Sequence, residues 1–207
     1  MTKTKFIRLS GWSLMLGAVT FFVSTRSALV ESNFYDPYMR LNIFVFYNTG
    51  LVLALWIGTI LLAVGGLGLR ARYGAQVGSS GKSFLLIGAI AGPIIGFLGV
   101  IGAVAKVIMW AEFLLYLGNM VLLACLTIFG ISVLRVKPLP RWNGLPFIAG
   151  LWFPVLLPSI IIANANGVPG SLILNIAKVT LVLQSIVLFM LGYVLQANVS
   201  EETPAIA

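Results

Sequence analysis

Long stretches of this chain carry no Asp, Glu, Lys or Arg, and this absence of charge limits the fold more than any other feature. Such stretches run between Arg8 and Arg26, between Arg40 and Arg70, between Lys82 and Lys106, and between Glu112 and Arg135. They are filled with Leu, Ile, Val, Phe, Ala and Gly. The hydrocarbon core of a bilayer is about 30 Å thick, and a helix of about 20 apolar residues crosses it. Because no soluble fold explains repeated runs of this length, they predict an integral membrane protein.

The apolar runs predict an all-α membrane protein with six transmembrane helices in one bundle. The spans are expected at about 9–30, 42–69, 84–105, 108–134, 144–163 and 169–196, with residues 197–207 as a disordered tail. Only 9% of the 207 residues are charged, and no charged or low-complexity stretch is long enough to form a separate soluble domain. Residues 1–207 are therefore expected to form a single domain. The basic N-terminus resembles a signal peptide, but the apolar segment after it is long enough to span, which favours an uncleaved first helix.

The distribution of Lys and Arg predicts the orientation of the bundle. One set of loops carries nine of them: Lys3, Lys5, Arg8, Arg70, Arg72, Lys82, Arg135, Lys137 and Arg141. The other set carries three: Arg26, Arg40 and Lys106. Basic loops stay in the cytoplasm, so both termini are expected there, with the chain in the inner (plasma) membrane of a bacterium. The expected partners on that side are the bilayer and its anionic headgroups rather than nucleic acid, although the net charge is +8.

Small residues in two of the spans mark expected helix contacts. The third span carries Gly88, Gly92 and Gly96 at steps of four, which forms a glycine zipper along one face. Pro93 lies inside the same span and is a candidate kink, as is Pro154 in the fifth span. This glycine face indicates either a tightly packed central helix, or a flexible gate or homodimer face.

The first span carries a similar stripe of small and hydroxyl residues. It consists of Ser13, Gly17, Thr20 and Ser24, at steps of four, three and four. Residues at these steps lie on one helix face, and their hydroxyls can bond a carbonyl of the preceding turn or of a neighbouring helix. The stripe therefore predicts a packing seam.

Two ionisable residues fall inside expected spans, where each costs about 2.5–3.5 kcal/mol on insertion scales. Lys178 lies on one face of the sixth span with Asn175, and Glu112 lies on one face of the fourth with Tyr116 and Asn119. The two faces lie at similar depth and are expected to face each other or a shared cavity. Further candidates for this intramembrane polar cluster are Asn48 and Arg26.

The cluster has a functional and a structural interpretation. The functional one is an outward-facing polar pocket that binds a small solute or conducts protons through Glu112. The structural one is a Glu112–Lys178 pair, or snorkelling of both side chains to the outer interface, which only fixes helix register.

Several kinds of site are not expected. The chain has no His, a single Cys and five scattered acidic residues, so neither a metal site, a cofactor nor a catalytic set is predicted. The segment Gly78-Ser-Ser-Gly81-Lys82-Ser83 resembles part of a phosphate-binding loop, but Gln76 replaces the first glycine and no strand precedes it. It is interpreted as a flexible cytoplasmic loop.

The sequence thus predicts a non-enzymatic role. The favoured hypothesis is an accessory, assembly or interaction subunit in the membrane, with other membrane subunits or a second copy as partners. The alternative is a small-solute or proton-coupled transporter or channel built around Glu112 and Lys178.

Overall fold

The protein is all-helical in the part of the chain that its computed structural model describes, residues 2–31, 49–105, 111–139 and 142–197. The helices are α1 (Lys3–Glu31), α2 (Thr49–Tyr73), α3 (Gly78–Ala105), α4 (Ala111–Val136), α5 (Leu145–Ala165) and α6 (Gly170–Ala197). No strand occurs among these residues. Five of the helices, as far as their described residues reach, are long and apolar enough to cross a membrane. The prediction of a multi-pass helical membrane protein is confirmed at this level.

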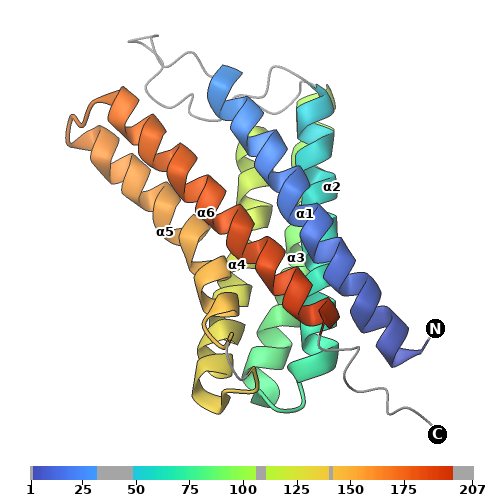
Figure 1. Cartoon of the computed structure of the whole chain (residues 1–207). Helices are drawn as coiled ribbons and strands as arrows, with labels where there is room; N and C mark the ends of the chain where they lie inside the picture. Colours follow the sequence, from blue (N-terminus) through green and yellow to red (C-terminus); the bar gives the residue numbers. More distant parts are fainter. Residues whose placement is uncertain (1, 32–48, 106–110, 140–141, 198–207) are drawn as a thin grey trace, which may run out of the picture.

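The six helices form a closed ring in chain order. Each helix packs against its neighbours in sequence, and α6 closes the ring against α1 (Figure 1). Within the described residues, α2 is the one helix that also reaches across the ring, to α4 and α6. The start of α1 and the end of α6 therefore lie at the same end of the bundle (Figure 1), which we call the basic end, and the opposite end is the far end.

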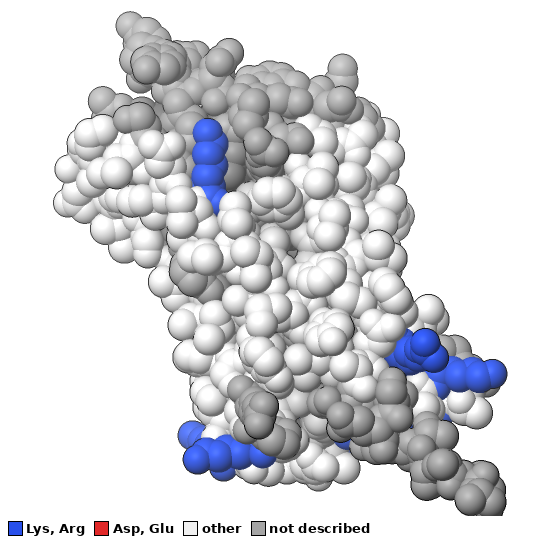
Figure 2. All heavy atoms as spheres, in the orientation of Figure 1, with Lys and Arg blue, Asp and Glu red and all other residues white. Residues whose placement is uncertain are grey.

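The name of the basic end comes from its side chains. Figure 2 shows Lys and Arg gathered toward this end of a largely uncharged surface, with a basic side chain set apart in the upper half. The five acidic residues of the chain lie at positions whose side chains the structure does not describe. Between the ends, large apolar side chains cover the surface, including Leu16, Ile94 and Ile186, each at least half exposed. In a bilayer such a belt contacts lipid.

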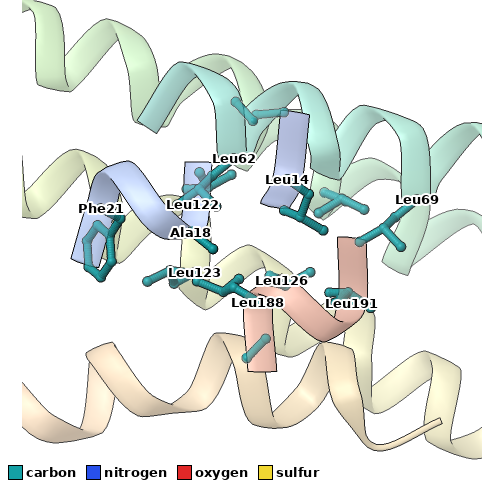
Figure 3. Close-up of a cluster of buried hydrophobic side chains, with 14 of the residues drawn as sticks. Leu14, Ala18, Phe21, Leu62, Leu69, Leu122, Leu123, Leu126, Leu188 and Leu191 are labelled. Atoms are coloured by element: carbon teal, nitrogen blue, oxygen red, sulfur yellow. The ribbon is translucent and has the colours of Figure 1, made fainter. Parts of the chain in front are cut away.

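The core is a set of leucines from helices on opposite sides of the ring. Leu14 of α1, Leu62 of α2, Leu123 of α4 and Leu188 of α6 converge there (Figure 3). All four are at most 3% exposed. The cavity left between them is about 10 Å³, roughly the smallest volume that holds one water molecule. The middle of the bundle is therefore closely packed and apolar.

Helix α3 extends beyond its expected membrane span of 84–105. α3 has 28 residues, which at about 1.5 Å each gives about 42 Å, more than the thickness of the hydrocarbon core. It begins at Gly78 instead of 84, so the expectation of a flexible loop over 78–83 is wrong. The connection before it is short and bonded: the amide N–H groups of Gly74 and Val77 donate to the carbonyls of Arg70 and Tyr73 at 2.9 and 3.1 Å.

Candidate functional site

Asn119, one of the expected cluster residues, bridges α4 to α2. Its side chain is fully buried, and its Nδ2 donates to Thr59 Oγ1 at 2.9 Å and to the carbonyl of Leu115 at 3.2 Å. The Thr59 hydroxyl in turn donates to the carbonyl of Leu55 at 2.9 Å. Tyr116, on the same face of α4, is also buried. The Asn119 side chain is therefore directed at α2.

The expected polar face of α6 lies beside its buried face and not within it. Asn175 is exposed, and Lys178 and Ser185 are half-buried. The buried positions of α6 follow a different stripe, which includes Ala177, Leu181, Gln184, Leu188, Leu191 and Leu195. Gln184, which no sequence pattern singled out, approaches the carbonyl of Ala149 in α5 with its Nε2, at 3.5 Å.

Of the described members of the expected cluster, Asn119 bonds Thr59 of α2. In the described residues α4 and α6 are not neighbours in the ring. The side chains of Glu112 and Arg26, and the whole of Asn48, lie outside the described residues. The expected meeting of the two polar faces thus stays a prediction.

Lys178 instead belongs to a face that borders a groove between α1 and α6. Residues 178, 182, 185 and 189 follow steps of four, three and four, which place them on one side of the helix. The groove has a volume of about 260 Å³, and its lining consists of Ala18, Val19, Phe22, Val182, Ser185, Ile186, Phe189 and Met190. We call it the α1–α6 groove.

One polar group in the lining of the α1–α6 groove stands out. The Oγ of Ser185 is buried and has no hydrogen-bond partner among the described residues. Every other lining residue is apolar. An unbonded hydroxyl in such surroundings costs free energy unless it finds an acceptor.

Two glycines of α3 lie against α4, and a third, Gly96, lies against Trp56 of α2. Gly88, Gly92 and Gly96 are all buried. A methyl group on Gly88 would lie 2.5 Å from Cβ of Cys125, and one on Gly92 would lie 2.9 Å from the carbonyl oxygen of Gly118, both in α4. These glycines therefore allow the backbones of α3 and α4 to approach closely.

The seam residues of α1 lie against α2 or bond within their own helix. Ser13 donates its hydroxyl to the carbonyl of Leu61 in α2 at 3.1 Å, and a methyl group on Gly17 would lie 2.9 Å from the backbone nitrogen of Leu62. Thr20 and Ser24 donate to carbonyls one turn earlier in α1, at 2.9 and 2.8 Å. The first two of these residues thus contribute to the close contact between α1 and α2.

Pro93 takes part in a contact that was not predicted from the sequence. The indole Nε1 of Trp56 in α2 donates to the carbonyl of Pro93 in α3 at 3.1 Å. The Trp56 ring also lies against Gly96 and 5.3 Å from the ring of Phe97. A tryptophan in the middle of an apolar run, whose N–H needs an acceptor, is the signal that could have found it. The side chain of Pro154 lies outside the described residues.

Neither metal chemistry nor relatives point to a function. Among the described residues, no group of three or more His, Cys, Asp or Glu side chains could hold a metal ion. No family model, curated protein or solved structure matches this chain. Its function must therefore be inferred from its own geometry, that of a multi-pass helical membrane bundle with an apolar groove between its first and last helices.

Proposed function

We propose that this protein is a non-catalytic interaction subunit whose α1–α6 groove receives a transmembrane helix of a partner protein. The observation that carries the proposal is an apolar groove whose lining includes the buried hydroxyl of Ser185, which has no hydrogen-bond partner in the described part of the chain. Lipid chains can fill an apolar groove, but they have no acceptor for a hydroxyl. A helix with a polar side chain or an accessible carbonyl supplies one.

Lys178 adds a second requirement on the partner. It lies seven residues before Ser185, about 10 Å along the helix, and on the same side of α6. It is half-buried, and no acidic side chain is among those that the structure describes. Because a cation in the hydrocarbon region is costly unless it is paired, the partner helix is expected to present a carboxylate near Lys178.

We further propose six membrane spans with both termini in the cytoplasm of a bacterial cell. The support is the gathering of Lys and Arg toward the basic end (Figure 2), where anionic headgroups would meet them. Reporter tags placed after residues 75 and 166 test this topology. They should be found on opposite faces of the membrane, and finding both on one face would refute it.

Site-specific photo-crosslinking in intact membranes tests the interaction role. A crosslinking residue replaces Ile186, which lines the α1–α6 groove and is 50% exposed, and a matched control replaces Ile94, which is 57% exposed on α3. We expect a discrete protein adduct from position 186 alone, identified by mass spectrometry of the crosslinked peptide. The Lys178→Met change should weaken this adduct.

The identity of the adduct decides between outcomes. A peptide from another membrane protein that carries a carboxylate in its span supports the proposal. A peptide from a second copy of this chain makes the α1–α6 groove a homodimer interface and contradicts the proposal. Lipid adducts alone, or equal protein adducts at both positions, also contradict it.

The alternative role is a transport pathway around Glu112 and Lys178. It requires polar side chains of α4 to meet those of α6, but Asn119 of α4 bonds Thr59 of α2 and Asn175 of α6 is exposed. We therefore favour the interaction role. Solute or proton uptake that is lost in Lys178→Met, with the folded protein retained, would reverse this preference.

A further inference from the structure

A second cavity lies at the basic end, where α2 passes into α3. Its volume is about 390 Å³, and its polar lining is Arg70, Ser79, Lys82 and Ser83. It thus combines two cations with two hydroxyls. It is separate from the α1–α6 groove, because the two cavities share no residue.

Arg70 is held in place at the edge of this cavity. Its Nε donates to the carbonyl of Lys82 at 3.2 Å, which links the last turn of α2 to the second turn of α3. One hydrogen bond at Nε orients the planar guanidinium and leaves the two terminal nitrogens to serve a ligand. Arginine held in this way is suited to the paired oxygens of a phosphate.

The first turn of α3 is fixed from its other side. Gly81 is buried, and a methyl group there would lie 3.0 Å from the hydroxyl oxygen of Ser132 in α4. Ser79, two residues before Gly81, and Lys82, directly after it, are exposed. The cavity is therefore built on a packed turn, and its polar side chains remain accessible to a ligand.

We propose that this cavity binds a phosphate group, carried either by an anionic lipid headgroup or by free phosphate. The two cations, Arg70 and Lys82, carry the assignment, because a phosphate supplies both charge and several acceptor oxygens. The hydroxyls of Ser79 and Ser83 add donors beside them. The site refines the headgroup contact proposed above and rests on that proposal only for which side of the membrane it faces.

Thermal unfolding of the full chain in neutral detergent tests the phosphate site. The midpoint is followed during titration with short-chain phosphatidic acid, with inorganic phosphate, and with phosphatidylcholine of the same chain length. We expect saturable stabilisation by phosphatidic acid in the unchanged protein. The double variant Arg70→Gln/Lys82→Gln should lose about tenfold or more in apparent affinity, because it removes two charge-assisted contacts.

A matched control separates a site from general attraction. The variant Arg135→Gln/Lys137→Gln removes the same charge, from side chains that do not line the cavity. It should change the affinity by about twofold at most, because exposed charges are screened by salt. An equal loss in both double variants would show diffuse attraction and overturn the proposal.

A third variant keeps the test decisive if the double variant does not fold. Ser79→Glu places a carboxylate in the cavity, and a negative charge in the first turn of a helix favours the helix. This variant should fold and fail to respond to phosphatidic acid, and an unchanged response would overturn the proposal.

The probes also separate the two sources of phosphate. Saturable stabilisation by inorganic phosphate, lost in Ser79→Glu, assigns free phosphate, whereas a response to phosphatidic acid alone assigns the headgroup. No saturable response to either probe, or an equal response to phosphatidylcholine, would overturn the site. Because the crosslinking experiment concerns a different face, the two proposals can fail independently.

Discussion

The two ends of the α5–α6 hairpin are packed differently, although both are made of the same kinds of residue. Near the basic end, Leu188, Leu191 and Leu195 of α6 are each at most 1% exposed. Toward the far end, Leu172, Ile176 and Val179 are 50, 48 and 59% exposed. Hydropathy alone does not distinguish these two sets of side chains.

Small residues account for the difference. Near the basic end, α6 crosses α1 through a pair of glycines: a methyl group on Gly11 would lie 2.8 Å from the carbonyl oxygen of Gly192, and the reciprocal distance is 2.7 Å. In α5, Gly150 lies against the backbone of α4 at Thr127. After Gly150 in α5, and between Gly170 and Gly192 in α6, neither helix has a glycine.

The physical reason lies in how helices associate in lipid. Lipid is as apolar as leucine, so close approach and hydrogen bonds, rather than hydrophobicity, decide which faces meet. After its first residue, Gly170, the far half of α6 has no glycine, and apart from the buried Leu181 its described large apolar side chains are exposed. The far ends of α2 and α4 are different, because Val52, Leu55 and Leu115 are buried beside the bond from Asn119 to Thr59.

The largest expected effect comes from breaking the glycine crossing at the basic end. Gly192→Leu should destabilise the protein by about 3 kcal/mol or more, because the clash is with backbone that cannot rotate away. Thermal unfolding in detergent would measure the loss. Its control is Ser159→Leu on α5, an exposed position toward the far end, which should shift stability by about 0.5 kcal/mol at most. Similar losses in both variants would remove the distinction between the two ends.

The same Leu-to-Ala substitution, made once near the basic end and once near the far end of α6, sharpens the comparison. Leu188→Ala should cost about 2 kcal/mol, because it leaves a cavity in the closely packed core. Leu172→Ala should cost about 0.5 kcal/mol or less, since lipid replaces the lost contacts. Unfolding in denaturant gives both values. If Leu172→Ala is the more damaging change, the far half of the hairpin is covered by protein.

The smallest expected effect concerns the hydrogen bond at the far end of α2 and α4. A double-mutant cycle with Asn119→Leu and Thr59→Val should give a coupling energy of about 0.6–1.7 kcal/mol, the range of interhelical hydrogen bonds in membranes. The measurement is the unfolding free energy of the two single variants and the double variant. A coupling of zero would mean that burial of these side chains, and not their bond, holds α2 to α4.

Much of the fold could be predicted from where charge is missing. The apolar runs correctly indicated helices and a membrane environment, because only a helix satisfies its own backbone groups in lipid. Their ends were placed less well: α3 begins at Gly78 rather than at 84, since apolar length reports the membrane core and not the helix. The six-span topology, its orientation and the kinks at Pro93 and Pro154 stay predictions.

The candidate site was harder to predict. Step patterns placed Asn119 and Lys178 on polar faces, but a pattern within one helix does not name the helix that it meets. The structure pairs Asn119 with Thr59. It places Lys178 on the same side of α6 as Val182, Ser185 and Phe189, which line the α1–α6 groove. The hydroxyl of Ser185 became informative only once its lack of a partner among the described residues was known.

The sequence by itself determined that the helices lie in a membrane, since the cost of burying charge in lipid is local and additive along the chain. Tertiary structure decided the neighbours: that α6 closes on α1, that Trp56 bonds the carbonyl of Pro93, and that Arg70 turns toward Lys82. These choices depend on the close approach of backbones far apart in sequence, and no single helix contains that information.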